Sequence, residues 1–148
     1  MEFRLVENML SPEDFSRLRE SAGWQSFSEE QLRRAMAGGL FTVAALGDEG
    51  VIGMGRLVGD GVMYWYLQDV VTLPQYQGLG IGRAIVGRLL DYIEQHALPG
   101  TRATVGLMAA EGKEEFYERF GFVTQPSAGH GAGMMRYLDI PERKMTGE

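Results

Sequence analysis

The stretch Asp69–Gln95, DVVTLPQYQGLGIGRAIVGRLLDYIEQ, decides the predicted fold. A strand-like run leads through three closely spaced glycines, Gly78, Gly80 and Gly82, into residues whose apolar members recur at the spacing of one helix face. A helix N-terminus exposes unpaired N–H groups and the positive end of the helix dipole, and glycine lets a ligand approach that backbone. The pattern therefore predicts a phosphate-binding turn; a plain glycine-rich turn is the alternative.

Two common phosphate-binding motifs do not match this stretch. A P-loop ends in Gly-Lys-Ser/Thr, whereas Gly82 is followed by Arg83 and Ala84. A dinucleotide fold needs G-x-G-x-x-G in its first β-α unit and an acidic residue about twenty positions later. Here the spacing is G-x-G-x-G, several strand-like segments precede it, and 99–101 reads Pro-Gly-Thr at that distance. Both motifs are excluded.

The rest of the chain predicts a mixed α and β domain. Capping boxes at 11–14 and 28–31 predict two early helices, and a short helix is expected over 112–120, closed by Gly121. Strands are expected at 1–8, 40–46, 51–58, 62–73, 102–108 and 131–139. Short turns rich in glycine and aspartate join the second to fourth of these strands into a meander. We expect one domain over 1–140 and a frayed C-terminal tail over 141–148.

Composition excludes several functional classes. The 148 residues include no cysteine, which excludes disulfides, thiolate metal sites and a cysteine nucleophile, and the two histidines give no support for a metal site. The net charge of −6 and the absence of a basic cluster argue against a nucleic-acid partner. With no signal-like start and no apolar run of membrane-spanning length, we expect a cytoplasmic protein without a membrane partner.

QGLGIG, residues 77–82, resembles the Q/R-x-x-G-x-G/A acetyl-CoA motif of the GCN5-related N-acetyltransferases (GNAT family). FYERFGF, residues 116–122, resembles a second motif of this family and follows at the expected spacing. Small bacterial members are the most similar, since they carry GRLVGDG in the meander and YLQDV before the glycine motif. The resemblance implies an α/β (α+β) GNAT fold, with a central mixed, largely antiparallel sheet that is splayed at the cofactor site and flanked by helices.

The resemblance also implies acetyl-CoA as cosubstrate. In the family, the backbone of the glycine turn holds the pyrophosphate, Gln77 supports the turn, and the strand before it offers main-chain hydrogen bonds to the pantetheine arm. The positions of this chain that match the cofactor-binding residues are Val70, Val71, Thr72, Gln77, Gly78, Leu79, Gly80, Ile81, Gly82, Arg83 and Phe116.

The implied reaction is transfer of acetyl to a primary amine, expected to belong to a small molecule, by direct attack in a ternary complex. An alkyl ammonium of pKa about 10.4 costs about 4.6 kcal/mol to deprotonate at pH 7, so a proton acceptor or a drain is needed. Tyr117 resembles the family's general acid, which reprotonates the leaving thiolate. The structural alternative for Tyr117 is aromatic packing beside Phe116 and Phe120.

Asp69 is the candidate base or ammonium anchor, because a carboxylate in an apolar strand is costly unless it is used or paired. A hydrogen bond to a turn, and a water chain with no single base, are the other readings. The sequence departs from the family at two places. The segment 103–108, ATVGLM, holds no glutamate that could serve as the base, and Ala110 stands where relatives often place a cofactor-contacting asparagine, which puts that contact in doubt.

The acceptor site is expected to include Trp24, Tyr66, Gln68 and Asp69, with the aromatic rings forming a pocket for an ammonium or an apolar amine. Alternation places Tyr66 and Trp65 on opposite faces, so both cannot line one surface. The alternative for the aromatic residues is the core. A homodimer is expected from the family. An acyl-CoA-binding sensor or partner module without turnover is the second functional hypothesis.

Overall fold

The computed structural model describes residues 2–142 of the chain. Contacts within the chain divide it into two compact units, Met1–Met108 and Ala109–Glu148. The first unit holds all the strands of the sheet, and the second holds one short helix and irregular chain. A single domain over 1–140 stays a prediction, and 143–148, most of the expected tail, lie outside the described residues.

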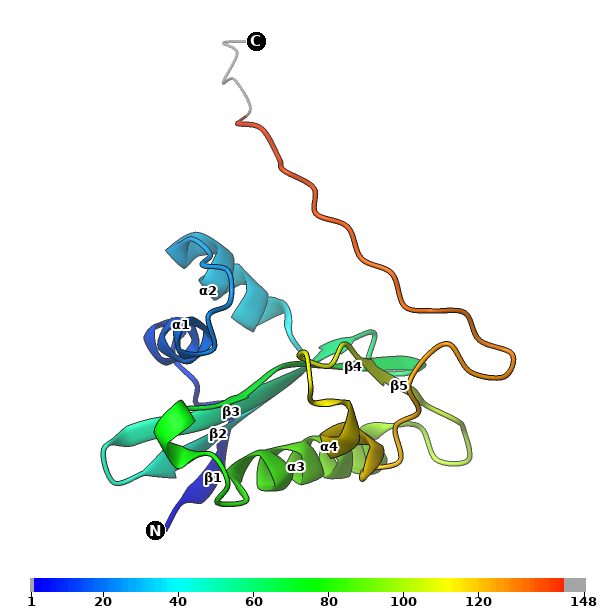
Figure 1. Cartoon of the computed structure of the whole chain (residues 1–148), viewed down its shortest axis with the longest axis horizontal. Helices are drawn as coiled ribbons and strands as arrows, with labels where there is room; N and C mark the ends of the chain where they lie inside the picture. The colour runs from blue at the N-terminus through cyan, green and yellow to red at the C-terminus, as the bar shows by residue number, and fades with distance from the viewer. Residues whose placement is uncertain (1, 143–148) are drawn as a thin grey trace. The chain divides into compact units, whose positions relative to one another are not determined.

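The first unit is built on a five-stranded sheet in the order β1-β2-β3-β4-β5. The strands are β1 Arg4–Glu7, β2 Phe41–Gly47, β3 Gly50–Gly59, β4 Tyr64–Thr72 and β5 Thr104–Leu107. β1 to β4 pair antiparallel, and β5 pairs parallel to β4. This confirms the predicted mixed, largely antiparallel sheet and its central meander, which appear in Figure 1 with β4 and β5 adjacent.

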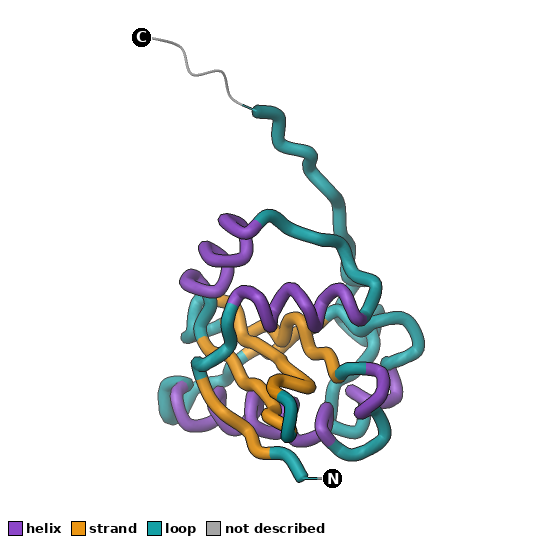
Figure 2. Tube along the Cα trace, turned by 90° about the vertical axis from the view of Figure 1, so that its left-hand side faces the viewer, coloured by secondary structure: helices purple, strands orange, loops and turns teal. Residues whose placement is uncertain are grey.

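Helices cover both faces of this sheet. The long helix α3, Ile81–His96, packs under β2, β3 and β4, and α1, Pro12–Ser21, lies on the other face with α2, Glu29–Gly38, beside it (Figure 1). Figure 2 shows the strands as a layer between these helices. A Cβ added at Gly53 or Gly55 would lie 2.8 Å from an α3 isoleucine methyl, so these glycines let α3 approach the sheet closely. None of the helices within 2–142 has both the length and the apolar character that a membrane crossing requires.

The early helices begin where the sequence predicts. The Ser11 side chain accepts the N–H of Asp14 at 3.1 Å, and Ser28 and Gln31 form a reciprocal capping box. Gly39 follows the last residue of α2. These caps satisfy N–H groups that a helix start would otherwise leave unpaired, so they define where both helices begin.

β4 contains a bulge at Asp69 and Val70 that shifts its register with β3. Opposite Gly55, the register moves from Met54↔Val71 to Arg56↔Gln68, which leaves Asp69 and Val70 as two residues facing one. Asp69 takes a φ of 56°, in the left-handed region. The β4–β5 ladder ends at Leu67, just before the bulge, so the remainder of β4 has an edge that β5 does not pair. This is the splayed geometry that the resemblance implies.

The second unit contains α4, Glu114–Glu118, within the predicted helix, and Gly121 with φ 91° follows it. The expected strand over 131–139 is wrong, because residues 132–142 have neither helix nor strand. Its apolar side chains are exposed, for example Met134 at 92% and Tyr137 at 72%. A β-like composition forms a strand only with a backbone partner, and within the described residues 131–139 find none.

Candidate active site

The turn before α3 presents free backbone N–H groups. The N-cap of α3 is Gly80, which has a left-handed φ of 85° and provides no side-chain hydrogen bond to the first turn. A Cβ added at Gly78 or Gly80 would meet no atom within 4 Å. The first turn has no acidic side chain and carries Arg83. The free N–H groups and the positive end of the helix dipole therefore favour an anion here.

Gln77 ties this turn to the end of β4, because its side-chain Nε2 donates to the carbonyl oxygen of Thr72 at 3.3 Å. Thr72 is the cross-strand neighbour of Gly53. The N–H of Leu73 donates to the carbonyl of Ile52, which makes Gly53 and Thr72 a non-hydrogen-bonded pair. The N–H and C=O of Thr72 therefore point away from β3, towards the edge that lies beyond the β4–β5 ladder.

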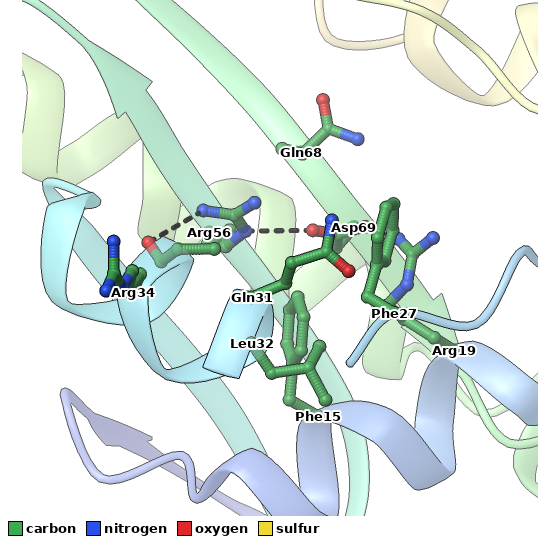
Figure 3. Close-up of a pocket in the computed structure, with 10 residues that line it drawn as sticks. Phe15, Arg19, Phe27, Gln31, Leu32, Arg34, Arg56, Gln68 and Asp69 are labelled. Atoms are coloured by element: carbon green, nitrogen blue, oxygen red, sulfur yellow. Dashed lines mark hydrogen bonds and ion pairs between the residues drawn. The ribbon is translucent and has the colours of Figure 1, made fainter. Parts of the chain in front are cut away.

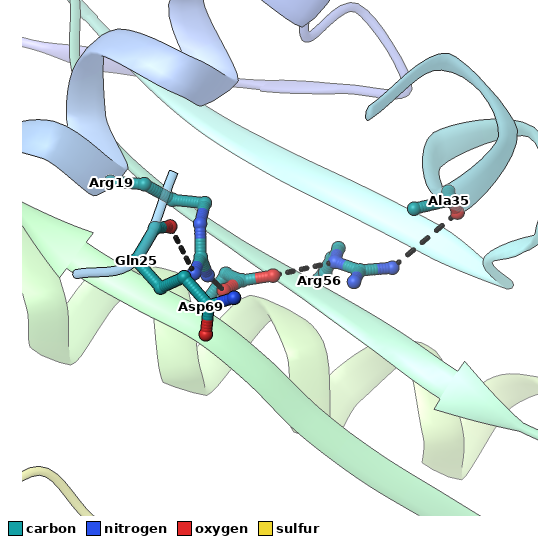
Figure 4. Close-up of polar contacts among 5 residues, drawn as sticks. All are labelled: Arg19, Gln25, Ala35, Arg56 and Asp69. Atoms are coloured by element: carbon teal, nitrogen blue, oxygen red, sulfur yellow. Dashed lines mark hydrogen bonds and ion pairs between the residues drawn. The ribbon is translucent and has the colours of Figure 1, made fainter. Parts of the chain in front are cut away.

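Asp69 forms the centre of a buried ion-pair cluster on the α1 side of the sheet. Its side chain is 1% exposed. Oδ1 accepts a hydrogen bond from Arg19 Nη1, and Oδ2 accepts one from Arg56 Nε at 2.8 Å (Figure 4). Arg56 Nη1 also reaches the carbonyl of Ala35 at 3.5 Å. Both oxygens of the carboxylate thus have a guanidinium partner, which compensates the burial of its charge.

Arg19 connects the loop after α1 to the bulge of β4. Its Nη2 donates to the carbonyl of Gln25 at 3.1 Å (Figure 4). The guanidinium carbon lies 4.9 Å from the ring centroid of Phe27 and 5.4 Å from that of Trp24. Both distances lie within cation–π range. Trp24 therefore contacts a cation that belongs to the protein itself.

A cavity of about 440 Å³ opens beside this cluster (Figure 3). Its walls come from α1, α2, the loop between them, β3 and the bulge of β4. The lining residues are Phe15, Arg19, Phe27, Gln31, Leu32, Arg34, Ala35, Arg56, Gln68 and Asp69. Three guanidiniums and one carboxylate thus meet in a space whose other walls are largely aromatic and aliphatic. The cavity is large enough for a small organic molecule.

Tyr117 and Phe116 lie on α4, in the second unit. The Tyr117 ring packs edge-to-face against Phe116 at 5.0 Å and against Phe122 at 6.1 Å. Burial raises the pKa of Tyr117 to about 12, because the phenolate would lose hydration. The phenol is therefore protonated throughout the neutral range and available as a hydrogen-bond donor.

The residues predicted to bind the acceptor do not all line the cavity. Gln68 and Asp69 line the cavity, whereas Trp24 reaches it only through its contact with Arg19. Tyr66 lies half-buried on β4, outside the lining, and burial raises its pKa. Trp65 points to the opposite face and packs edge-to-face with Tyr92 of α3, as alternation predicts.

Sequence reasoning missed the principal cavity residues, Phe15, Arg19, Phe27 and Arg56. Arg56 carried a usable signal: it interrupts the apolar run 51–58, and a buried charge in such a strand needs a partner. Arg19 carried none, because α1 is rich in polar residues and a single arginine there is ordinary.

Comparison with known proteins identifies the family. The model of the acetyltransferase (GNAT) domain matches residues 8–136, so the chain belongs to the GNAT family. Relatives and structural neighbours are named acetyltransferases, which supports an acyltransferase enzyme. A rice protein named serotonin N-acetyltransferase 2, chloroplastic, is 33% identical over 77% of this chain and 57% of its own length.

Other relatives come from red algae and bacteria. An uncharacterized N-acetyltransferase named ycf52 from Pyropia yezoensis is 23% identical over 80% of this chain and 68% of its own length. The chain thus spans about 57 to 68% of these two curated relatives. Among solved structures, SA2161 of Staphylococcus aureus matches with a TM-score of 0.80 and 27% identity, covering 92% of this chain and all of that one. The GNAT protein SP0256 of Streptococcus pneumoniae matches at 0.75 and 26%, covering 93% and 98%.

Proposed function

We propose that this enzyme transfers an acetyl group from acetyl-CoA to the primary amine of a small molecule, by direct attack in a ternary complex. The observation that carries the proposal is the turn before α3. It combines an uncapped helix start at Gly80, no acidic residue in the first turn, and open space over both turn glycines. This is the environment that a pyrophosphate needs.

Acetyl-CoA would supply the acetyl group as an activated thioester. The backbone of 79–83 would hold the pyrophosphate, with Gln77 fixing the turn through its bond to Thr72. The outward N–H and C=O groups on the 70–72 edge of β4 would bind the pantetheine arm. Phe116 is included among the residues that would bind acetyl-CoA because it matches a cofactor-binding position of the family. The open space over Gly78 and Gly80 is compatible with a close approach of the pyrophosphate to the backbone.

The acceptor amine must lose a proton, at a cost of about 4.6 kcal/mol at pH 7 for an ordinary alkyl ammonium. Asp69 is poorly placed as a base or ammonium anchor, because Arg19 and Arg56 already engage both of its oxygens. We assign it instead to positioning these two arginines. The proton would then leave through water to bulk solvent, the route without a single base.

Tyr117 would donate a proton to the leaving thiolate as general acid. With its pKa raised to about 12 by burial, full transfer to a thiolate of pKa about 8.5 is uphill by about 5 kcal/mol. If Tyr117 donates a hydrogen bond to the leaving thiolate and transfers its proton only late in the step, most of that cost is avoided. The acceptor would approach along Gln68 and Tyr66, with Trp24 holding Arg19 in place.

A second candidate is an acyl-CoA-binding sensor or partner module without turnover. The observation that favours it is the engagement of both Asp69 oxygens, which removes the nearest carboxylate from proton transfer. A homodimer remains a prediction of the family resemblance, and a cytoplasmic location remains a prediction from the sequence.

The test is free-thiol release from acetyl-CoA in the presence of a panel of amines: polyamines, amino sugars, amino acids, lysine peptides and arylalkylamines. Serotonin belongs in the panel because of the rice relative's name. Amine-dependent thiol release, with the acetylated amine seen by mass spectrometry, supports the enzyme. Binding of acetyl-CoA without release from any amine supports the sensor module instead.

A further inference from the structure

The cavity beside Asp69 contains more positive charge than it neutralises internally. Arg19 and Arg56 are 12% and 13% exposed, and the one buried carboxylate they share is Asp69. Two guanidiniums against one carboxylate leave an excess of one positive charge among largely buried groups. Arg34, the third arginine of the lining, is 80% exposed and paired with Glu30 at 2.8 Å, so it adds no buried charge.

The two buried arginines also have donors left over. The Nε of Arg19 is buried and has no hydrogen-bond acceptor among residues 2–142. Arg56 uses Nε and Nη1, and its Nη2 has no acceptor within the same part of the chain. Arg19 Nε is closed off from solvent, whereas Arg56 Nη2 is not among the buried unpaired atoms and can be reached by an acceptor in the cavity. A second anion in the cavity would accept a hydrogen bond from Arg56 Nη2 and balance the excess positive charge of the two guanidiniums.

The remaining walls favour an organic anion over a bare ion. Phe15 is 2% exposed and lies with its ring 5.4 Å from the guanidinium carbon of Arg56, and Phe27 covers Arg19. The side chain of Gln68 lines the cavity and makes no hydrogen bond within the described residues. Gln68 lies on β4 only two residues before Val70, where the predicted pantetheine edge starts.

We infer that the acceptor amine carries an anionic group, a carboxylate or a phosphate-like group, which binds Arg19 and Arg56 while the amine lies towards the 70–72 edge of β4. A guanidinium forms charge-assisted hydrogen bonds to either kind of anion. Asp69 positions the guanidiniums of Arg19 and Arg56 and neutralises one of their two charges. One positive charge is left for the substrate. This rests on the proposed acetyl transfer, and it replaces the expected pocket for an ammonium or an apolar amine.

Turnover of matched amines tests the acceptor class. The probes are 4-aminobutyrate, 3-aminopropylphosphonate, the neutral 4-aminobutyramide and the dicationic putrescine, which present ordinary alkyl ammonium groups on similar chains. We expect kcat/KM for one of the anions to exceed that of the amide by at least about tenfold, since hydrogen bonds to charged groups discriminate by that much. Equal values for the anions and the amide would overturn the inference.

Variants locate the effect. Arg56→Gln should reduce the preference to within about twofold, whereas Arg56→Lys, which retains the charge without the fork, should keep part of it. The matched control is Arg88→Gln, which removes an arginine from a pair with Glu7 at 2.8 Å on another part of the surface. It should leave the preference intact. A preference that survives in Arg56→Gln would contradict the assignment of the site.

Direct binding separates this inference from the proposed function. Benzoate and benzamide have the same ring and differ in charge, and calorimetry without acetyl-CoA on the wild type and on Arg56→Gln separates binding in the cavity from binding at the turn before α3. We expect benzoate to bind at least about tenfold more tightly than benzamide. If no amine is turned over but this difference holds, the proposed function fails and the anion site stands. If benzoate shows no advantage, the anion site is absent.

Discussion

The turn before α3 and the cavity beside Asp69 share strand β4 but are built in different ways. The turn consists of consecutive residues, 77–83, and offers backbone N–H groups. Its glycines contribute by having no side chain, which leaves this backbone open. The cavity collects side chains from α1, α2, β3 and β4, separated by up to 50 positions in the pair Arg19–Asp69. The geometry of the turn therefore depends on a few neighbouring residues, whereas the stability of the cavity depends on charged side chains from several elements.

The largest effect should follow from removing the charge at the centre of the cavity. Asn tolerates the left-handed φ of position 69, so Asp69→Asn changes charge with little backbone strain. Two buried guanidiniums lose their carboxylate, and we expect the free energy of unfolding in denaturant to fall by about 3–5 kcal/mol. The control is Glu7→Gln, which removes the carboxylate of an exposed pair and should cost less than about 1 kcal/mol. Equal losses of unfolding free energy in the two variants would mean that the arginines of the cavity do not depend on Asp69.

The next effect concerns Tyr117, which lies in neither region. Tyr117→Phe should lower kcat by about 100-fold and leave acetyl-CoA affinity unchanged, because only proton donation is removed. Tyr137→Phe, at an exposed tyrosine of the second unit, is the control and should have no effect. Because burial raises the pKa of Tyr117 to about 12, the wild-type kcat should show no tyrosine ionisation below about pH 11. An unchanged kcat in Tyr117→Phe would remove the general-acid role.

A smaller effect should separate backbone strain from ligand binding at the turn. Gly80 and Gly100 have φ values of 85° and 79°, and an added Cβ meets nothing within 4 Å at either position. Gly80→Ala and Gly100→Ala should therefore both cost about 1–2 kcal/mol of stability. Only Gly80→Ala should weaken acetyl-CoA binding, by about tenfold, measured by calorimetry. Similar affinities in the two variants would argue that the turn is structural only.

The smallest effect should come from another turn of consecutive residues, between β3 and β4. Asp60 Oδ1 accepts the N–H groups of Tyr64, Val62 and Met63 at 3.0, 2.8 and 2.8 Å, and these bonds lower the pKa of Asp60. A lowered folded pKa stabilises the protein above the unfolded pKa of about 3.9, and this contribution is lost as pH falls through the folded value. The Tm of wild type should exceed that of Asp60→Asn at pH 7, and the gap should narrow as pH falls below about 3.9.

Asp48→Asn, in the turn between β2 and β3, is the control for this titration. The Asp48 side chain makes no hydrogen bond within the described residues. Asp48→Asn removes no hydrogen bond to a backbone N–H, so it should not reproduce the Tm gap that Asp60→Asn shows at pH 7. A pH-independent gap for Asp60→Asn would mean that these hydrogen bonds do not act through the carboxylate charge.

The same contrast explains how far the sequence could be used to predict the molecule. Ser11, Ser28 and Gly80 signal helix ends through local chemistry, and the structure places helix starts beside each of them. The meander followed from alternation and short turns. The strand expected over 131–139 failed because a strand needs a partner, and pairing is not a local property.

The cavity was predicted only in part for a related reason. Asp69 stood out as a carboxylate in an apolar strand, and it is indeed paired. Its partners could not be identified from the sequence, because Arg19 comes from a helix 50 positions away and resembles any surface arginine. The bulge that turns both Gln68 and Asp69 to the cavity was implied by family resemblance, but no residue pattern in β4 required it.

The central claim is that the turn before α3 binds the pyrophosphate of acetyl-CoA. Calorimetric titration of the wild type with acetyl-CoA and with acetylpantetheine, which carries the same thioester without the pyrophosphate, tests it directly. We predict that acetyl-CoA binds at least about 100-fold more tightly, since charge-assisted hydrogen bonds and the helix dipole act on the pyrophosphate alone. Equal affinities for the two ligands would contradict the claim.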